Sequence, residues 1–405
     1  MKQQNTLQPK LRFPEFSGDW ESDKFKSYVK LNQGLQIPIS ERFTEYVPNS
    51  YFYITNEFLN KNSGKSYYIV NPSNSVICKE SDILMTRTGN TGKVVTNVKG
   101  AFHNNFFKIS YNSNVYKDFL YFYLIHPKIQ HIILSRAGTS TIPDLNHSDF
   151  YSINFVHPSL TEQQKIADYL TTIDKKISLL EEKKTELLRY NKAMMQKLFA
   201  QEIRFKDENG NDFPEWEDLT IGDIVSNIGG TALEKYVDIK SNYKFISIGN
   251  YSKDGRYIDN NARIELNDKT KTKLLNKNDL VMVLNDKTSS GDIIGSTILI
   301  DDDNYIYNQR SERLIPKDFI NSRFLWHKLN SKDFRKKVFT NAQGGTQIYV
   351  NFPIVKKLSV KIPSLPEQEK IADFLSAMDE SIEKVNEQII QTQSFKKAML
   401  QQMFV

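Results

Sequence analysis

Hydrophobic residues follow a heptad pattern in two segments of the chain, 160–200 and 365–405. In each segment apolar side chains recur at alternating steps of four and three residues, without an interior glycine or proline. A period of 3.5 residues sustained over this length is typical of a coiled coil, and helices of this length span about 50 Å. The pattern therefore predicts two long helices that pack through one stripe. The expected core positions are Ile166, Leu170, Ile173, Ile177, Leu180, Leu187, Met194, Leu198, Ile371, Leu375, Met378, Ile382, Val385, Ile389, Met399 and Met403.

The two segments also repeat each other in sequence. LTEQQKIADYL at 160–170 returns as LPEQEKIADFL at 365–375, an offset of 205 positions, and KAMMQKLF returns as KAMLQQMF at the same offset. Each helix also has a matching stretch far upstream, LRFPEFSGDW ending at Trp20 and IRFKDENGNDFPEW ending at Trp216. A solenoid repeats every ~20–50 residues, so this much longer period indicates a duplicated domain.

Between these landmarks lie two bodies with short β-rich segments and polar turn clusters, which predict mixed α/β domains. The expected boundaries are 1–159 for the first body, 160–200 for the first helix, 201–364 for the second body and 365–405 for the second helix. One helix is expected in each body, at Lys117–Leu134 and at Ser322–Val338. The expected strands include Tyr67–Val70, Lys93–Val98, Phe106–Tyr111, Ser296–Ile300 and Tyr305–Tyr307.

An antiparallel arrangement of the two helices is expected, with Ile166 opposite Met403 and Leu198 opposite Ile371. The second helix then returns to the first body, and a single chain acquires a pseudo-two-fold axis. The two bodies would lie at opposite ends of the helical spacer, which corresponds to about 14 base pairs of DNA. The fold class is α+β.

Composition sets broad limits on the function. The 405 residues carry a net charge of +6, which is only mildly basic and by itself weak support for nucleic-acid binding. No apolar run approaches the ~18–20 residues of a membrane span, and the N-terminus lacks the apolar stretch of a signal peptide, so a cytoplasmic protein without a membrane partner is expected. Cys78 is the single cysteine, so internal disulfides are excluded.

No catalytic constellation is visible in the sequence. The stretch 88–93, TGNTGK, has the wrong glycine spacing for a phosphate-binding loop, and Val94 stands where the hydroxyl that binds Mg²⁺ belongs. No GxGxxG follows a strand, and the six histidines are scattered without cysteine partners. We therefore expect no catalytic residue, no metal site and no cofactor bound by this chain.

Three pairs of polar loops, one loop of each pair in either body, suit DNA instead. Arginine reads guanine and asparagine or glutamine reads adenine through paired hydrogen bonds, whereas lysine and hydroxyl groups suit phosphates. For any single residue, ordinary solvated loop polarity is the competing interpretation. The candidates in the first body are Arg87, Thr88, Asn90, Lys93, Asn104, Asn105, Arg136, Thr139 and Ser140. Those in the second body are Lys287, Thr288, Ser289, Asn308, Gln309, Arg310, Gln343, Thr346, Gln347 and Tyr349.

The chain resembles the specificity subunit of type I restriction-modification systems over nearly its whole length. The EQxKIADxL helices, the KAMxQxxF ends, the stretches that end in Trp20 and Trp216, and the Asn308-Gln309-Arg310 turn carry the resemblance. It implies two target-recognition domains, each binding half of a bipartite site on double-stranded DNA, and two conserved helices that dock two methyltransferase subunits. It also implies that the chain is not catalytic: the partner subunits would supply S-adenosylmethionine-dependent adenine methylation, and a motor-nuclease subunit would use ATP and Mg²⁺ for restriction.

Three other classes stay open. A stand-alone DNA-binding regulator or an anti-restriction protein would explain two DNA-binding bodies but not the long repeated helices. A single-chain fusion of methyltransferase and specificity subunit would need cofactor motifs that the sequence lacks, and a scaffold that binds no DNA is a third possibility. Co-purification with a methyltransferase would discriminate among them.

The two helices differ in charge. Residues 160–200 carry 8 basic and 6 acidic side chains, a net +2, whereas residues 365–405 carry 4 basic and 7 acidic side chains, a net −3. If both helices dock the same partner, the two docking events are expected to differ in their salt dependence.

Overall fold

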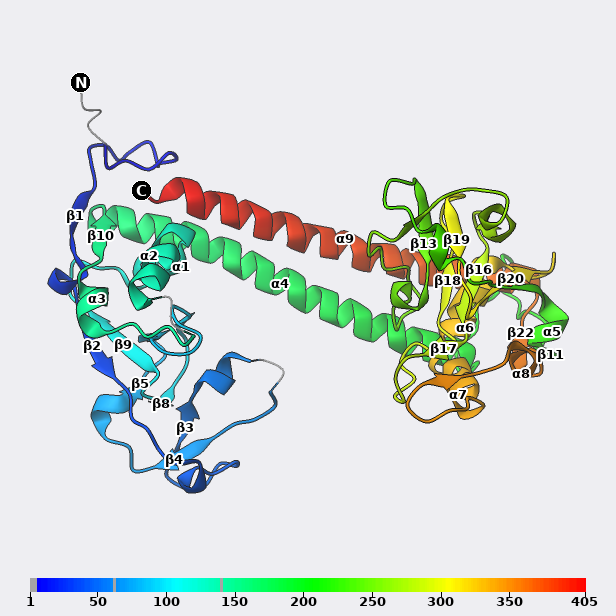
Figure 1. Cartoon of the computed structure of the whole chain (residues 1–405), viewed down its shortest axis with the longest axis horizontal. Helices are drawn as coiled ribbons and strands as arrows, with labels where there is room; N and C mark the ends of the chain where they lie inside the picture. The colour runs from blue at the N-terminus through cyan, green and yellow to red at the C-terminus, as the bar shows by residue number, and fades with distance from the viewer. Residues whose placement is uncertain (1–5, 61–62, 139–140) are drawn as a thin grey trace. The chain divides into compact units, whose positions relative to one another are not determined.

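A computed structural model of the chain describes residues 6–60, 63–138 and 141–405. The chain divides into two compact units. Unit 1 runs from the N-terminus to Glu181 and includes Glu387–Val405, and unit 2 is Glu182–Asn386. Each unit therefore contains one body and a portion of both long helices (Figure 1). No helix within the described ranges is long and apolar enough to cross a lipid bilayer.

The body of unit 1 has two four-stranded sheets, β2-β9-β6-β7 and β4-β3-β8-β5, and a two-stranded pair, β1-β10. The only parallel pairing among these strands joins β3 to β8. The strands are β1 Glu21–Lys24, β2 Val29–Gln33, β3 Ser50–Ile54, β4 Tyr68–Val70, β5 Ile77–Cys78, β6 Ile83–Thr86, β7 Val94–Val95, β8 Gly100–Phe102, β9 Phe106–Tyr111 and β10 Asn154–His157. The helices of the body are α1 Lys117–Ile125, α2 Pro127–Ala137 and α3 His147–Tyr151.

The body of unit 2 repeats this plan with sheets β12-β20-β16-β18 and β14-β13-β19-β15, and with the pairs β11-β22 and β17-β21. Again one pairing is parallel, between β13 and β19. The strands are β11 Glu217–Thr220, β12 Val225–Gly229, β13 Tyr243–Ile246, β14 Arg263–Ile264, β15 Leu274–Leu275, β16 Leu280–Val283, β17 Asn285–Asp286, β18 Thr297–Leu299, β19 Tyr305–Tyr307, β20 Ser311–Pro316, β21 Ile348–Tyr349 and β22 Ser359–Ile362. The helices are α5 Ile221–Ile224, α6 Ser322–Asn330, α7 Lys332–Thr340 and α8 Phe352–Lys356.

The matching strand orders confirm the duplicated α+β domain that the repeated sequence predicts. Each body is closed by its first and last strand, with Glu21 opposite His157 in unit 1 and Glu217 opposite Ile362 in unit 2. The chain therefore enters and leaves each body at neighbouring points, directly before a long helix.

Two long helices follow the bodies, α4 Leu160–Phe199 and α9 Leu365–Met403, and they run antiparallel in both units. In unit 1, Lys396 Nζ lies 2.5 Å from Asp174 Oδ1, and the core includes both Ile166 and Met403. In unit 2, Asn191 Nδ2 donates to Asp379 Oδ1 at 2.9 Å. Every position of the expected stripe is buried or half-buried. The predicted antiparallel packing is confirmed.

The single helix expected in each body is wrong, because both bodies have two helices at that place. In unit 1 the break falls at His126, whose ψ of 133° is extended because Pro127 disfavours a helical residue before it. At the corresponding break in unit 2 the next residue is Lys332 and not proline. Here Ser331 breaks the helix by adopting ψ of 148° and accepting a hydrogen bond from the backbone N–H of Phe334.

The repeated EQ dipeptide at the start of each long helix fastens the upstream stretch to the helix. In unit 1, Arg12 Nε and Nη2 each donate to one oxygen of Glu162 at 2.8 Å. In unit 2, Arg204 donates to Glu367 at 3.1 and 2.9 Å, and Trp216 Nε1 donates to the same carboxylate at 3.1 Å. Paired arginine–carboxylate bonds of this kind fix geometry as well as charge. The Arg–Glu clamp explains why the upstream stretch and the helix start recur together.

The glutamine of the dipeptide holds the body to the helix. Gln163 Oε1 accepts from Tyr116 N and its Nε2 donates to Asn114 O, both at 2.9 Å. Gln368 makes the equivalent bonds with Asn321 N and Phe319 O at 2.9 and 3.1 Å. Because both ends of each buried amide are satisfied, the dipeptide sets how each body meets its own helix.

The upstream stretch reaches the end of a long helix by different routes in the two units. In unit 2 the chain leaves α4 at Phe199 and continues directly to Arg204. In unit 1 the corresponding helix end is the C-terminal end of α9. The upstream stretch contacts it through a hydrogen bond that Leu11 N donates to Gln402 O at 2.9 Å, between two segments that are far apart in the sequence. The same domain is therefore continuous in unit 2 and assembled from both chain ends in unit 1.

The burial of Lys328 predicts a pH-dependent stability for unit 2. It lies on α6 with 5% of its surface exposed, and its ammonium is 4.8 Å from the ring centre of Phe199. Burial lowers its pKa to about 8, whereas an unfolded lysine keeps a pKa near 10.4. The folded state therefore disfavours the charged form of Lys328. The resulting loss in the free energy of unfolding is complete below pH 8 and becomes smaller as the pH rises toward 10.4.

Lys328→Met should raise the free energy of unfolding at pH 7 by up to about 3 kcal/mol. The gain should shrink between pH 8 and pH 10, which denaturant unfolding of the two proteins at matched pH can measure. Lys271→Met, at an exposed position of the same unit, is the control. A gain that stays constant across this range would show that burial of the charge is not the cause.

Candidate nucleic-acid interface

In unit 1 hydrogen bonds join two of the candidate loops to residues 143–145, which follow the third. The loop between β6 and β7 is joined to the turn between β8 and β9, because Arg87 N donates to Asn105 O at 2.7 Å. The same loop is joined to the segment after α2, because Leu145 N donates to Arg87 O at 3.0 Å and Thr91 Oγ1 donates to Pro143 O at 2.7 Å. Three segments, whose joined residues lie up to 58 positions apart (Arg87 and Leu145), therefore form one surface, which we call loop cluster 1.

Unit 2 repeats this junction with its own three loops. Leu284 N donates to Arg310 O at 2.8 Å, which joins the loop after β16 to the turn between β19 and β20. Val350 N donates to Leu284 O at 2.9 Å, and Asn285 pairs with Tyr349 in the short β17-β21 ladder. We call this surface loop cluster 2. The first two loop pairs identified from sequence are therefore structural equivalents. The third loop joins the cluster at Tyr349–Val350 in unit 2, whereas in unit 1 the junction lies at 143–145, just past the expected loop, and Arg136 lies on the last turn of α2.

Each cluster depends on one glycine, Gly34 directly after β2 or Gly230 directly after β12, where the chain passes the central turn. A Cβ atom on Gly34 would lie 2.2 Å from Phe102 O, and one on Gly230 would lie 2.0 Å from Asn308 O. Any side chain would displace the turn that carries the Asn and Gln candidates. These glycines hold the clusters in shape through close backbone contact.

Arg87 of loop cluster 1 is engaged inside the protein. Its Nε and Nη2 donate to the carboxylate of Asp144 at 3.1 and 2.6 Å, and its guanidinium lies over the Phe107 ring. Thr88 Oγ1 donates to the same carboxylate. Partial burial raises the pKa of Asp144, but the hydrogen bonds from Thr88 and Arg87 outweigh it and the pKa is lowered. The guanidinium of Arg87 is therefore occupied by Asp144 in this structure.

The other candidates of loop cluster 1 differ in exposure. Asn90, Lys93 and Arg136 are exposed, whereas Asn104 and Asn105 are half-buried. Asn104 Nδ2 donates to Gln36 Oε1 at 3.1 Å. Thr139 and Ser140 lie outside the described residues.

In loop cluster 2 the turn between β19 and β20 separates one buried amide from two exposed side chains. Asn308 is 5% exposed; its Oδ1 accepts from Leu233 N at 3.1 Å, and its Nδ2 donates to Glu234 at 2.8 Å. The hydrogen bond from Asn308 lowers the pKa of Glu234. Gln309 is exposed and donates to Glu234 at 2.9 Å. Asn308 thus shapes the turn, which corrects its expected place on the exposed face.

Arg310 occupies the left-handed region with φ of 68°, which is uncommon for a non-glycine residue. Its carbonyl is used to join the loops while its side chain is exposed to solvent. Backbone strain of this kind is often found at functional positions. The remaining exposed candidates of this cluster are Lys287, Thr288, Ser289, Gln343, Thr346, Gln347 and Tyr349.

Several residues that support the clusters were not found from the sequence. Asp286 is 5% exposed and accepts from Thr288 N and Ile293 N, both at 2.9 Å, which folds the loop that presents Lys287. Arg335 on α7 donates to three backbone carbonyls, among them Asp292 O at 2.8 Å, and so fixes the base of the same loop. The Asp-x-Thr spacing is typical of an Asx turn and is the one signal that could have identified Asp286.

Within the described part of the chain, no group of three or more His, Cys, Asp or Glu side chains is placed to hold a metal ion. What the clusters offer is hydrogen-bond donors and acceptors on loops that a rigid body supports. That chemistry serves recognition of a polar, anionic surface.

Two copies of the sequence model described as "Type I restriction modification DNA specificity domain" match the chain, at residues 18–189 and 214–392. The chain belongs to this family. The specificity subunit of the type I restriction enzyme MjaVIII from Methanocaldococcus jannaschii is 25% identical over 401 residues, covering 96% of this chain and 92% of that protein. The StySPI specificity subunit from Salmonella potsdam is 26% identical over 288 residues, covering 67% of this chain and 61% of that protein.

Solved structures show the same fold. The S subunit of a type I restriction-modification system from M. genitalium matches with a TM-score of 0.62 and 17% identity, covering 98% of this chain and 99% of that one. A chain from a study of complex assembly and conformational transition of the type I system matches with a TM-score of 0.56 and 14% identity, covering 94% and 96%. The resemblance expected from sequence is confirmed at the level of family and fold.

Proposed function

We propose that this chain is the DNA-reading, non-catalytic specificity subunit of a type I restriction-modification complex. Each loop cluster reads one half of a bipartite site on double-stranded DNA. The chain directs two adenine methyltransferase subunits, which use S-adenosylmethionine, and restriction subunits that use ATP and Mg²⁺. The observation that carries the proposal is the recurrence of the same three joined loops on two copies of one fold, within a chain that belongs to the specificity family.

We assign DNA contacts to the exposed side chains of each loop cluster, and support of the loop conformation to the buried side chains. In loop cluster 2, Arg310 and Gln309 are the first candidates for base contacts, and Lys287 with its neighbouring hydroxyl groups for phosphates. In loop cluster 1, Asn90 and Arg136 are exposed and are candidates for base contacts, and Lys93 is a candidate for a phosphate contact. Arg87 would contact a base only after its hydrogen bonds to Asp144 are broken.

Arg310→Ala should weaken binding of the cognate site by about 1–3 kcal/mol and relax one position of one half-site. Lys287→Ala should weaken binding to every sequence and reduce the salt slope by about one. Both are measured by titrating the complex of this chain and its methyltransferase onto cognate and scrambled duplexes at several salt concentrations.

Arg310→Lys and Lys287→Arg are the matched controls, since both preserve charge. Arg310→Lys should lose specificity while keeping salt dependence, and Lys287→Arg should behave like the parent. Equal losses on cognate and scrambled DNA for Arg310→Ala would remove it from base recognition. Failure of the parent to co-purify with a methyltransferase while still binding DNA would favour the stand-alone regulator.

A further inference from the structure

An exposed apolar side chain lies on the last turn of α2 in unit 1 and of α7 in unit 2. Leu134 on α2 is 45% exposed, and Phe339 on α7 is 43% exposed. The residues directly before them, Ile133 and Val338, are completely buried. Each helix therefore presents one apolar residue to solvent next to a residue of the core.

The packing of the buried neighbours shows that these two helix positions are equivalent. A Cβ atom on Gly92 would lie 3.3 Å from Ile133 Cγ2, and one on Gly295 would lie 2.8 Å from Val338 Cγ1. The N–H group of each glycine donates at 2.8 Å to the last residue of the strand before its loop, β6 in unit 1 and β16 in unit 2. The exposed apolar residue that follows is therefore repeated in both copies of the domain.

In loop cluster 2 the ring of Phe339 packs on the first of the joined loops. A Cβ atom on Gly291 would lie 2.5 Å from Phe339 Cε2 and 2.6 Å from Ile348 Cδ1, so the ring edge rests against the backbone of the loop that carries Lys287. Ile348 belongs to the third loop of the cluster, next to Tyr349. The exposed part of the ring therefore belongs to the surface of loop cluster 2.

Leu134 holds the corresponding place beside loop cluster 1. Gln130 lies one turn earlier on the same side of α2, and its Nε2 donates to Gly92 O at 2.8 Å. Leu134 therefore borders the loop that carries Asn90 and Lys93. In both units an apolar side chain lies next to the polar candidates for DNA contacts.

The major groove of DNA offers one apolar feature to such a side chain. Base edges there carry hydrogen-bond donors and acceptors, together with the C5-methyl group of thymine. A leucine or phenylalanine that covers this methyl group removes apolar area from water. The alternative use of an apolar residue is insertion between stacked bases. Less than half of each side chain is exposed and the rest packs on its own body, which favours contact with a methyl group over insertion.

We infer that Leu134 and Phe339 are specificity-determining residues, each of which covers the methyl group of one thymine in the half-site that its unit reads. The inference rests on the proposed function and adds thymine to the bases that the polar candidates recognise. Because the contact is apolar, it favours thymine over bases without a methyl group and adds nothing to the salt dependence of binding.

The test replaces the thymines of the cognate duplex one at a time by deoxyuridine, which pairs in the same way and lacks only the methyl group. The cognate site is defined beforehand by mapping the adenines that the complex methylates. The complex of this chain and its methyltransferase is then titrated onto each duplex. One substitution in each half-site should weaken binding about fourfold, as expected for one methyl group removed from an apolar contact.

Leu134→Ala should abolish the response to deoxyuridine in one half-site, and Phe339→Ala should abolish it in the other. Each variant should bind the normal duplex about fourfold more weakly than the parent, with an unchanged salt slope. The losses from the side chain and from the methyl group should not add, because both changes remove the same contact. Leu134→Met and Phe339→Leu keep an apolar side chain and should retain the response.

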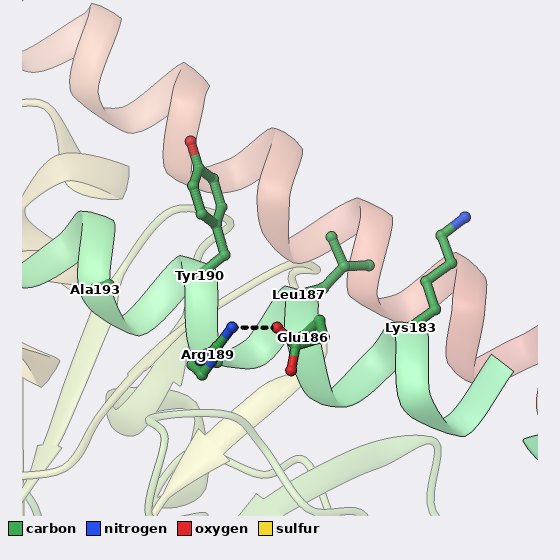
Figure 2. A pocket seen from close by; sticks show the side chains of 6 residues that line it. All are labelled: Lys183, Glu186, Leu187, Arg189, Tyr190 and Ala193. Carbon is green, nitrogen blue, oxygen red and sulfur yellow. Dashed lines mark hydrogen bonds and ion pairs between the residues drawn. The ribbon is translucent and has the colours of Figure 1, made fainter. Parts of the chain in front are cut away.

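Two exposed residues of α4 provide matched controls outside the loop clusters. Tyr190 in unit 2 is 50% exposed and lines a shallow hollow of about 510 Å³, whose lining side chains all come from α4 (Figure 2). Leu179 in unit 1 is 55% exposed. Tyr190→Ala and Leu179→Ala should respond to deoxyuridine as the parent does. A response that the controls also lose would overturn the assignment to Leu134 and Phe339.

The remaining outcomes separate this inference from the proposed function. A parent that prefers its cognate duplex but is indifferent to every deoxyuridine substitution would overturn the thymine contact and leave the proposed function standing. Equal losses of Leu134→Ala and Phe339→Ala on normal and deoxyuridine duplexes, with a rise in 2-aminopurine fluorescence in the parent complex, would overturn it in favour of insertion between bases. A parent without preference for the cognate duplex would overturn the proposed function and this inference with it.

Discussion

Glu367→Leu is expected to destabilise unit 2 by about 3 kcal/mol, the largest loss from any single side chain of the Arg–Glu clamps. Glu367 is completely buried and accepts from Arg204 and from Trp216 Nε1. Its removal leaves a guanidinium and an indole N–H without their carboxylate. Arg204 keeps 20% of its side chain exposed and other acceptors nearby, so the loss falls at the low end of the range for a broken buried pair.

The repeat supplies a matched comparison for this experiment. Glu162→Leu breaks the equivalent pair with Arg12, but Trp20 Nε1 has no hydrogen-bond partner among the residues that the structure describes, so this loss should be smaller by about 1 kcal/mol. Hydrogen exchange of the intact chain reports each unit separately, and protection should fall in unit 2 for Glu367→Leu and in unit 1 for Glu162→Leu.

Two further variants test the cause. Arg204→Met combined with Glu367→Leu should recover much of the loss, because no unpaired charge is left behind. Glu369→Leu, at an exposed position of the same turn, should cost little. A loss from Glu369→Leu equal to that from Glu367→Leu would mean that the buried pair does not fasten the upstream stretch.

The parts of the fold that were predictable are those fixed by local periodicity or by the internal repeat. The heptad stripe placed Ile166, Leu198 and Ile371 in the core because helical packing follows a spacing visible along the chain. The three loop pairs were found because both copies carry polar loops at corresponding positions. Their convergence follows from strand pairing, which the sequence did not show.

Features that depend on contacts between distant residues were not predictable. Arg12 and Glu162 lie 150 positions apart, so nothing local identifies them as partners, although the repeat marked both stretches. Asn308 is buried and donates a hydrogen bond to Glu234, which lies far away in the sequence. The guanidinium of Arg87 is paired with Asp144, which belongs to another loop. The helix break at His126 was signalled by Pro127 and was missed, whereas the break at Ser331 has no comparable signal.

The central claim is that each unit reads one half-site by itself. Residues 217–364 can be exchanged as one segment, because β11 pairs with β22 and brings the two ends of this body together. An exchange at these boundaries retains Arg204, Trp216 and Glu367, so the clamp on α9 is preserved. The replacement should come from a relative that recognises a different half-site.

The decisive measurement is a genome-wide map of methylated adenines in cells that carry the exchanged chain together with its methyltransferase. The account predicts that the half-site read by loop cluster 2 changes to that of the donor, while the half-site read by loop cluster 1 stays as it was. A map in which both half-sites change together, or in which methylation stays at the original sites, would contradict the account.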